Sequence, residues 1–296
     1  MSIDSMLLKE LTKDYLVTLE RIIMQNYSGP KALTEYILHQ SKHKANKPFM
    51  ILLVQGILAG IYISLGAIGF LKLSVATSDP GIGFFLGALV FPIGIIAIIL
   101  MQAELFTSDS MVMIAVYARR TKMHKILRIL LLILIANFIG GIATAFITKT
   151  SGIFNENVMN LVIEKALHKV QMPFGQLFVS AILCNIIVST GVCLAYSCRE
   201  EISKVVVVWL AITVFVLSGT EHVVANAYYL SIAYLGGAKI SLMEIANNLS
   251  VAAIGNFIGG GILVSGINYL LAYKDIAKEK KEITTSQNMI SQKRFL

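Results

Sequence analysis

The sequence predicts an all-α integral membrane protein with six transmembrane helices, and three observations support this fold class. Of the 296 residues, 56% are hydrophobic and 14% are charged, and the mean hydropathy is +0.75. A soluble domain carries about 25% charged residues. The apolar residues form blocks of helix length, whereas a transmembrane β-barrel would show short alternating segments. Polar residues interrupt two of these blocks, and a five-residue motif recurs in two others.

The residues before the first apolar block, 1–47, are predicted to form a cytoplasmic leader. Between Leu7 and Ile23, leucine and isoleucine recur at helical spacing with lysines among them. This pattern predicts an amphipathic helix that lies on the membrane surface or on a neighbouring subunit and is ended by Gly29-Pro30. The leader lacks the apolar core that a cleavable signal peptide requires.

Residues 48–273 form the predicted membrane domain, and residues 274–296 are predicted to be a flexible cytoplasmic tail. A helix needs roughly 20 residues to cross the hydrocarbon of a bilayer. The second apolar segment is too long for one helix and is interrupted at Glu104–Ser110. The six segments lie at about Phe49–Val75, Ile82–Tyr117, Ile126–Ile147, Phe174–Ser197, Val205–Leu235 and Leu249–Tyr273.

The fifth segment is interrupted at residues 218–222, and neither of its halves alone would cross a bilayer. This interruption contains Gly219, Glu221 and His222. Ionisable side chains are costly at membrane depth, so they indicate a functional site by default. Irregular backbone is tolerated there only where protein buries it or where it lines a cavity. We therefore expect the two interruptions to face each other inside the protein and to bring Thr107 and His222 together.

The distribution of basic residues predicts that both termini lie in the cytoplasm. With this topology the leader, the 118–128 loop, the 198–204 loop and the tail all lie inside, and cytoplasmic loops carry an excess of Lys and Arg. The net charge of +8 is then explained by membrane topology rather than by nucleic-acid binding, and we expect a multi-pass protein of the plasma membrane. These four regions contain 20 of the 25 lysines and arginines. The other five are Lys72, Lys149, Lys165, Lys169 and Lys239.

An internal repeat relates the two halves of the membrane domain. Asn137-Phe138-Ile139-Gly140-Gly141 recurs as Asn256-Phe257-Ile258-Gly259-Gly260, 119 residues later, and the two interrupted segments share this register. Three helices per half give the halves opposite orientations, which predicts an inverted 3+3 repeat. Such repeats hold the ligand path at their interface near the midplane. The paired glycines allow neighbouring helices to pack closely.

Several motifs, in order and with this topology, resemble the formate/nitrite transporter family. The resemblance covers roughly residues 45–273, and the family includes formate, nitrite and hydrosulfide channels and lactate/formate permeases. It implies an aquaporin-like six-helix protomer with broken second and fifth segments, and a homopentamer with one pore per subunit. The motifs are Phe91-Pro92-Ile93-Gly94, Glu104-Leu105-Phe106-Thr107, Gly219, Glu221-His222, Ala225-Asn226 and Gly255-Asn256-Phe257-Ile258-Gly259-Gly260.

The resemblance also implies roles for individual residues. His222 matches the central pore histidine, and Thr107 matches the threonine that hydrogen-bonds toward it. Lys169 matches the basic residue at the base of the outer vestibule, and Asn185 is expected beside the outer constriction, so that these four residues contact the pore or the substrate. The other implied groups are an outer constriction of Phe91 and Phe215, an inner constriction of Leu105 and Ile95, and a loop scaffold of Glu104, Glu221 and Asn226.

The chain departs from the family pattern near the pore, which leaves the identity of the anion open. The usual Phe-Thr-Gly-Asn is Phe106-Thr107-Ser108-Asp109, and Met101-Gln102 replaces Thr-Gly. Thr220 stands where formate channels carry an aromatic residue. Formate is the default substrate, and nitrite, hydrosulfide, lactate and acetate are alternatives.

The expected mechanism is proton-coupled transport of a small monovalent anion. An isolated charge pays many kcal/mol to enter an apolar constriction. Lys169 and the helix ends would concentrate the anion, and a proton would then join it so that the neutral acid crosses. A histidine titrates near neutral pH, so His222 is expected to gate the pore or relay the proton, while Thr107 orients the substrate.

Three other functions remain open at this stage. An aquaporin-type pore for neutral solutes is disfavoured because no Asn-Pro-Ala pair occurs. A membrane-embedded enzyme could use Glu221 and His222 as acid and base, but the apolar segments contain no second histidine and no metal-ligand spacing. A membrane anchor or assembly subunit would use the leader and the tail.

No cofactor or metal is expected, and the partners are an anion, a proton, the lipid bilayer and further copies of the chain. The cysteines are predicted to be packing residues: Cys184, Cys193 and Cys198.

Overall fold

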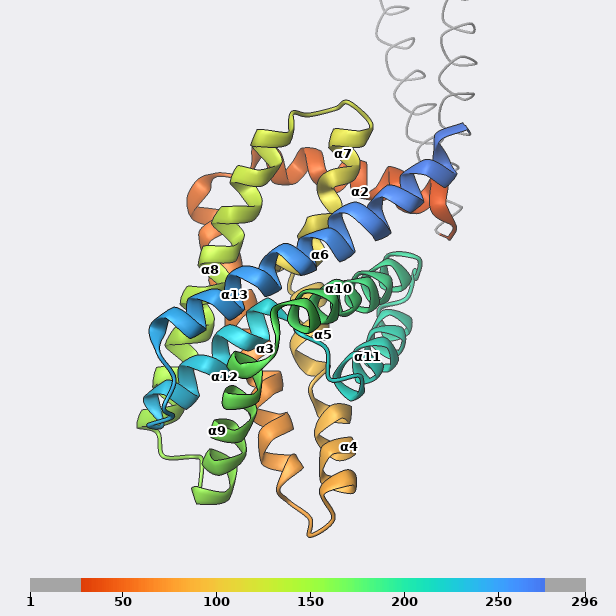
Figure 1. Ribbon diagram of the computed structural model, residues 1–296. Coiled ribbons are helices and arrows are strands. Elements are labelled where there is room, and N and C mark those ends of the chain that lie inside the picture. The colour runs from red at the N-terminus through yellow and green to blue at the C-terminus, as the bar shows by residue number, and fades with distance from the viewer. Residues whose placement is uncertain (1–27, 275–296) are drawn as a thin grey trace, which may run out of the picture.

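The computed structural model describes residues 28–274, and this part of the chain is helical without strands (Figure 1). The leader helix predicted between Leu7 and Ile23, and the tail after residue 274, lie outside the described residues. The first half contains α2 (Pro30–Asn46), α3 (Phe49–Ser74), α4 (Pro80–Val90), α5 (Ile93–Leu100), α6 (Phe106–Asp109), η1 (Ser110–Met113), α7 (Ile114–Tyr117) and α8 (Met123–Thr150). The second half contains α9 (Glu156–Gln171), α10 (Phe174–Tyr196), α11 (Glu201–Leu217), α12 (Val223–Leu235), α13 (Leu242–Phe257) and the π-helix η2 (Ile258–Val264).

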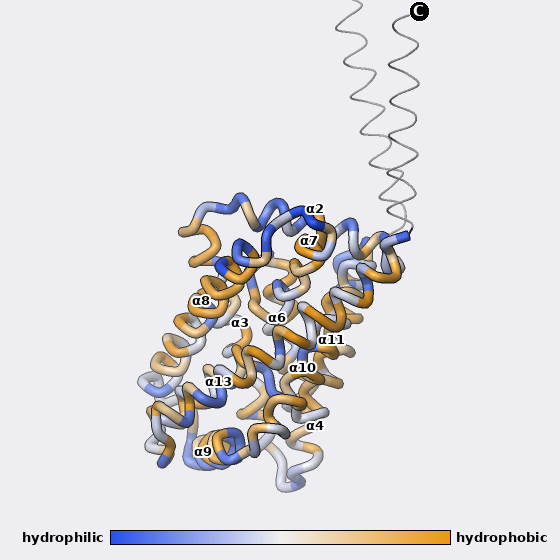
Figure 2. The backbone as a smooth tube through the Cα atoms, turned by 45° about the horizontal axis from the view of Figure 1, so that its top comes forward, coloured by the Kyte–Doolittle hydropathy of each residue, from blue (hydrophilic) through white to orange (hydrophobic). Residues whose placement is uncertain are grey.

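Between residues 28 and 274, five helical stretches are long and apolar enough to cross a membrane. Two further helices, α11 and α12, have 17 and 13 residues, so each is shorter than the roughly 20 that a span requires. Figure 2 shows hydrophobic residues along the long helices and hydrophilic residues at the end of the molecule that carries α2. The five stretches are Phe49–Ser74, Pro80–Leu100, Met123–Thr150, Phe174–Tyr196 and Leu242–Lys274.

Proline determines where two of the long helices begin. Pro48 directly precedes α3 and Pro173 directly precedes α10, so these helices begin at the predicted residues, Phe49 and Phe174. The residue before each proline has an extended backbone, because the proline ring excludes the helical conformation there. This ends α2 and α9, the shorter helices that come before α3 and α10.

The last helix begins earlier than the sequence predicts. Its predicted start is Leu249, whereas α13 begins at Leu242. The Ser241 side chain accepts a hydrogen bond from the Glu244 N–H, and the Glu244 carboxylate accepts one from the Ser241 N–H. This capping box satisfies two backbone groups at the helix start, so the helix begins before the apolar run does.

The interruption of the second segment is shorter and lies earlier than predicted. Helical structure is lost at residues 101–105 and resumes at Phe106, although the predicted interruption covers Glu104–Ser110. The polar residues in α6 and η1 do not break the helix, because the hydroxyls of Ser108 and Ser110 donate to backbone carbonyls three residues earlier. In the fifth segment, α11 ends at Leu217 and α12 begins at Val223, which leaves residues 218–222 non-helical, as predicted.

The glycines of the repeated motif allow close helix packing in both halves. Helix α3 packs against α8, and α10 packs against α13. A Cβ atom on Gly140 would lie 2.1 Å from the carbonyl oxygen of Ile57, and one on Gly259 would lie 2.3 Å from the carbonyl oxygen of Ile182. Both obstacles are backbone atoms of the neighbouring helix, so neither position has room for a side chain.

We expect Gly259→Ala to lower the melting temperature of the purified protein, because the added methyl group must displace the α10 backbone. Overpacking of this kind typically costs about 1–3 kcal/mol. Gly175→Ala is the control, since a Cβ on Gly175 of the same helix pair meets no atom within 4 Å. Thermal denaturation in detergent measures both variants, and a Gly259→Ala protein as stable as the wild type would contradict this packing.

Candidate functional site

The asparagine of the repeated motif holds the interruption in the first half. The side-chain nitrogen of Asn137 donates to the carbonyl oxygens of Gly56 and Glu104, at 2.8 and 2.9 Å. Its side-chain oxygen accepts from the N–H of Phe106 at 2.9 Å. The fully buried amide therefore satisfies the backbone groups on either side of Leu105, which the interruption would otherwise leave unpaired.

Asn256 makes the same set of contacts in the second half. Its nitrogen donates to the carbonyl oxygens of Ala181 and Glu221, at 2.7 and 2.9 Å. Its oxygen accepts from the N–H of Val223 at 2.9 Å. The residue enclosed between the two bonded groups is His222, in the position that Leu105 has in the first half. The repeated asparagine thus sets the backbone geometry of both interruptions.

The two interrupted segments meet at Thr107 and His222. Thr107 Oγ1 lies 3.0 Å from His222 Nε2, and the two side chains are 0% and 2% exposed. Thr107 comes from the short helix α6, and His222 is the N-cap residue of α12. The structure therefore brings together the two residues that the sequence predicts to meet.

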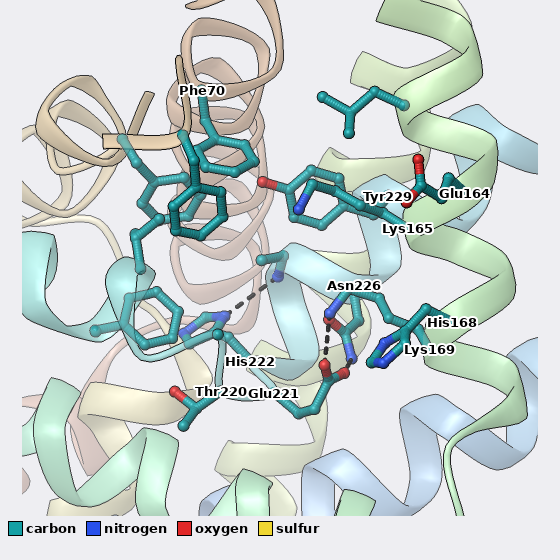
Figure 3. A pocket seen from close by; sticks show the side chains of 17 residues that line it. Phe70, Glu164, Lys165, His168, Lys169, Thr220, Glu221, His222, Asn226 and Tyr229 are labelled. Atoms are coloured by element: carbon teal, nitrogen blue, oxygen red, sulfur yellow. Dashed lines mark hydrogen bonds and ion pairs between the residues drawn. The ribbon is translucent and has the colours of Figure 1, made fainter. Parts of the chain in front are cut away.

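The second ring nitrogen of His222 determines which tautomer is present. Its Nδ1 accepts a hydrogen bond from the N–H of Ala225 at 3.2 Å, so in the neutral ring the proton is on Nε2 (Figure 3). Nε2–H therefore donates to the Thr107 oxygen. The hydroxyl hydrogen of Thr107 is then free to donate to another group, because His222 is the hydroxyl's one partner among the described residues.

Glu221 is held by a lysine and an asparagine and lies at the floor of a cavity. Its carboxylate accepts from Lys169 Nζ at 2.8 Å and from the side-chain nitrogen of Asn226 at 2.6 Å (Figure 3). Asn226 also donates to Asn248 at 2.9 Å. Glu221 is 2% exposed, so these contacts compensate a buried charge next to His222.

Glu104 occupies the corresponding position in the first half and also pairs with lysines. Lys44 of α2 contacts the carboxylates of both Glu104 and Asp109, and Lys47 contacts Glu104 at 2.5 Å. Burial disfavours the charged form of Lys44, but the negative charges of Asp109 and Glu104 raise its pKa above the usual value. Two lysines and two carboxylates thus form a balanced cluster beside the first interruption.

Two aromatic rings lie beside His222. The ring centroids of Phe91 and Phe215 are 5.9 Å apart, and those of Phe215 and His222 are 5.7 Å apart. Both phenylalanines are almost completely buried. Leu105 and Ile95 are 0% and 2% exposed and line neither of the two cavities described next.

Two cavities lie on either side of this layer of residues. The α9 cavity has a volume of about 320 Å³ and reaches Phe91, Phe215 and His222. The α2 cavity has a volume of about 610 Å³, and Lys44, Lys47, Glu104 and Asp109 are among its lining residues. Helices α2 and α9 lie at opposite ends of the molecule (Figure 1). The buried contact of Thr107 with His222 therefore lies between two hollows that approach it from opposite ends.

Asn185 contacts backbone groups of both halves of the chain. It is fully buried in α10, and its side-chain nitrogen is within hydrogen-bonding distance of the backbone oxygens of Thr107 and Asn256 and of the Ser110 hydroxyl. Its oxygen accepts from Ser189. It lines neither cavity, and its polar atoms hold the restarted helix. Its place beside the outer constriction stays a prediction.

The sequence of this chain matches a known protein family. Residues 31–270 match the family described as formate/nitrite transporter. The chain belongs to this family. The resemblance inferred from the motifs is thereby confirmed, and the protein is an integral membrane protein of a transporter family rather than an enzyme.

Other formate/nitrite transporters align along most of their length. The transporter YrhG of Bacillus subtilis and the formate channel BtFdhC of Bacillus thuringiensis are each 30% identical, over 87% and 84% of this chain and 98% and 96% of their own. A solved FNT family ion channel has a TM-score of 0.75 at 25% identity, over 81% of this chain and 98% of its own. A pentameric formate channel with formate bound has a TM-score of 0.67 at 27% identity, over 76% of this chain and 97% of its own.

Sequence reasoning missed the basic residue at the first interruption of this formate/nitrite transporter. Lys44 forms an ion pair with Glu104, as Lys169 does with Glu221. Of these two lysines, the sequence predicts only Lys169 as a site residue. A signal was present, because each lysine stands four residues before a Pro-Phe pair, Pro48-Phe49 or Pro173-Phe174. Among the described residues no group of three His, Cys, Asp or Glu could hold a metal ion.

We expect Lys44→Ala to destabilise the protein strongly, because it leaves two buried carboxylates without a shared cation. Breaking a buried ion pair costs about 3–5 kcal/mol. Adding Asp109→Asn to Lys44→Ala should recover part of this loss by removing one of the two negative charges. Lys204→Ala is the control, since Lys204 pairs with the exposed Glu201 and such pairs contribute about 0–1 kcal/mol. If the changes in melting temperature caused by Lys44→Ala and by Asp109→Asn simply add up in the double variant, Lys44 and Asp109 are not coupled.

Proposed function

We propose that this chain forms a homopentameric channel that carries small monovalent anions, formate by default, across the plasma membrane together with protons. Formate channels among the relatives support the substrate, and the pentameric formate channel among the similar structures supports the assembly. The observation that carries the proposal is the buried contact of Thr107 with His222, which lies between two cavities and joins the two interruptions.

We further propose that residues 48–273 form a six-span channel domain with an aquaporin-like inverted 3+3 repeat and two broken helices. Support comes from the matching contacts of Asn137 and Asn256 and from the matching pairs Lys44–Glu104 and Lys169–Glu221. With both termini in the cytoplasm, the α2 cavity opens to the inside and the α9 cavity to the outside. Residues 274–296 remain a predicted flexible tail.

The proposed path crosses the apolar layer as a neutral acid. An anion in the α9 cavity faces the rings of Phe91 and Phe215, which offer no hydrogen bonds to replace its water, so crossing as a charge is costly. A proton taken up by the anion removes this cost. Beyond the rings, the free hydroxyl hydrogen of Thr107 donates to an oxygen of the permeating molecule, while Nε2–H of His222 holds the hydroxyl oxygen. Leu105 and Ile95 form the second apolar layer.

His222 is the residue through which protons control the path. A proton on Nδ1 would occupy the lone pair that accepts from the Ala225 N–H, and would therefore break the cap of α12. The interruption at residues 218–222 would then lose one of its restraints. Glu221 and Asn226 hold the rest of this loop, and Glu104 holds the loop of the first half.

Uptake of labelled anions into liposomes that contain the purified protein tests the proposed function. Formate should enter, and competition by nitrite, hydrosulfide, lactate and acetate should rank the substrates. Protein-free liposomes measure the passive permeation of the neutral acids and must be subtracted. Glycerol or water flux without anion flux would replace the proposal by an aquaporin-type pore. A protein that moves none of these solutes would leave an anchor or assembly role instead.

A further inference from the structure

Lys165 of α9 extends into the α9 cavity and lies one helical turn before Lys169 (Figure 3). Its Nζ atom lies 5.0 Å from the ring centroid of Phe70 and 5.2 Å from that of Phe84. These two rings pack edge to face, with centroids 5.4 Å apart. Distances below about 6 Å are typical of cation–π contacts, so the rings fix the position of the ammonium group.

The charges that line the α9 cavity are not compensated equally. Lys169 is bound to Glu221, and this pair has no net charge. Lys165 makes no ion pair with any residue between 28 and 274. The neighbouring Glu164 is exposed, so water screens its charge, whereas Lys165 is half-buried. Lys165 therefore supplies the uncompensated positive charge of the cavity.

The surroundings of Lys165 favour an incoming anion. Burial and the positive charge of Lys169 lower the pKa of Lys165, while Glu164 and Glu221 act against this shift. The charged ammonium group is thus destabilised by its partial loss of water and by its neighbour. An anion beside it would offset both costs, because an opposite charge stabilises the charged form.

We propose that Lys165 is the anion-docking residue of the α9 cavity and that the rings of Phe70 and Phe84 beside it favour small carboxylates. A carboxylate binds the ammonium group, and its hydrogen atom or short alkyl chain rests on the aromatic surface. The inference rests on the proposed transport function. It assigns to Lys165 the recruiting role that the sequence assigns to Lys169, whose charge is already used to hold Glu221.

Concentration-dependent formate uptake by Lys165→Gln, Lys165→Arg and Lys149→Gln tests the role of the charge. Lys165→Gln should raise KM by about tenfold, because one contact with a charged group is lost, and should leave the maximal rate within about twofold. Lys165→Arg should restore most of the affinity. Lys149→Gln removes an exposed charge near the end of α8 and should behave as wild type. Glu164→Gln should change KM by less than about twofold, since water screens the exposed charge that it removes.

An unchanged KM in Lys165→Gln, or a lower maximal rate with unchanged KM, would overturn the proposal in favour of a packing role.

Phe84→Ala tests the contribution of the aromatic rings beside Lys165, with Phe85→Ala on the exposed face of α4 as its control. Phe84→Ala should weaken acetate uptake more than nitrite uptake, and equal losses would overturn the carboxylate preference. Wild-type protein without anion flux would refute the proposed function instead. In that case, saturation-transfer NMR with ¹³C-formate measures anion binding at Lys165 directly. Lys165→Gln must then bind formate more weakly than the wild type.

Discussion

Asn256→Ala and Asn137→Ala should each reduce formate uptake to the level of protein-free liposomes and lower the melting temperature by many degrees. Each asparagine makes three buried hydrogen bonds, two to backbone groups that flank an interruption and one to a carbonyl of a neighbouring helix. Without the amide, the N–H and the carbonyl beside each interruption lose this partner, and a buried unsatisfied group costs about 1–3 kcal/mol. The loops that carry His222 and Leu105 would then lose their defined positions.

A third asparagine provides the control for this comparison. Asn268, in the helix that continues α13, donates a single hydrogen bond to the carbonyl of Val264 and is partly buried. Asn268→Ala should retain transport and nearly all of the stability. The prediction is contradicted if Asn256→Ala transports formate at the wild-type rate, or if Asn268→Ala is as damaging as the other two. A large effect at Asn256 with none at Asn137 would contradict the equivalence of the two halves.

His222→Phe should flatten the pH dependence of formate uptake and lower its rate by about tenfold, because two buried hydrogen bonds beside the path are lost together with the ring nitrogen whose protonation is proposed to control it. Phenylalanine keeps a ring of similar size beside Phe215 but removes both the donor to Thr107 and the acceptor for the Ala225 N–H. Initial rates of uptake between pH 5 and pH 8 measure the effect.

The control for this experiment is His124→Phe, which replaces an exposed histidine at the start of α8 that lines neither cavity. It should keep the wild-type rate and pH profile. If His222→Phe retains the wild-type pH profile, protons do not act at His222, whatever its rate of transport. Thr107→Val, which removes the hydroxyl at nearly constant volume, should lower the rate and leave the pH dependence in place.

Much of the fold could be predicted from the sequence, because apolar length and proline positions determine most helix boundaries locally. Phe49 and Phe174 begin helices since Pro48 and Pro173 exclude the preceding residues from a helix. The helix α2 was not predicted, although Pro30 stands in its first turn, because it is polar and Gly29-Pro30 was interpreted only as the end of an earlier helix. The start of α13 was predicted too late, since a capping box and not hydropathy sets it.

The site could be predicted in part. The repeated motif and the interruptions together led to Thr107 and His222, which the structure places within hydrogen-bonding distance. The clamping contacts of Asn137 and Asn256 were not predicted, since their partners lie more than 30 residues away and an isolated asparagine in an apolar helix has no visible role. The sequence also could not show that the charge of Lys169 is paired. This follows from the distance of 2.8 Å between Lys169 and Glu221, which the order of residues does not reveal.

Joint passage of the anion and a proton can be measured as the internal pH of liposomes that contain the protein and a trapped fluorescent pH indicator. The pH is recorded after external formate is added without an ion gradient. We expect internal acidification that is faster than in protein-free liposomes and in step with labelled formate uptake, with no membrane potential. Formate uptake that builds a negative internal potential without acidification would show that the bare anion crosses and that no proton accompanies it.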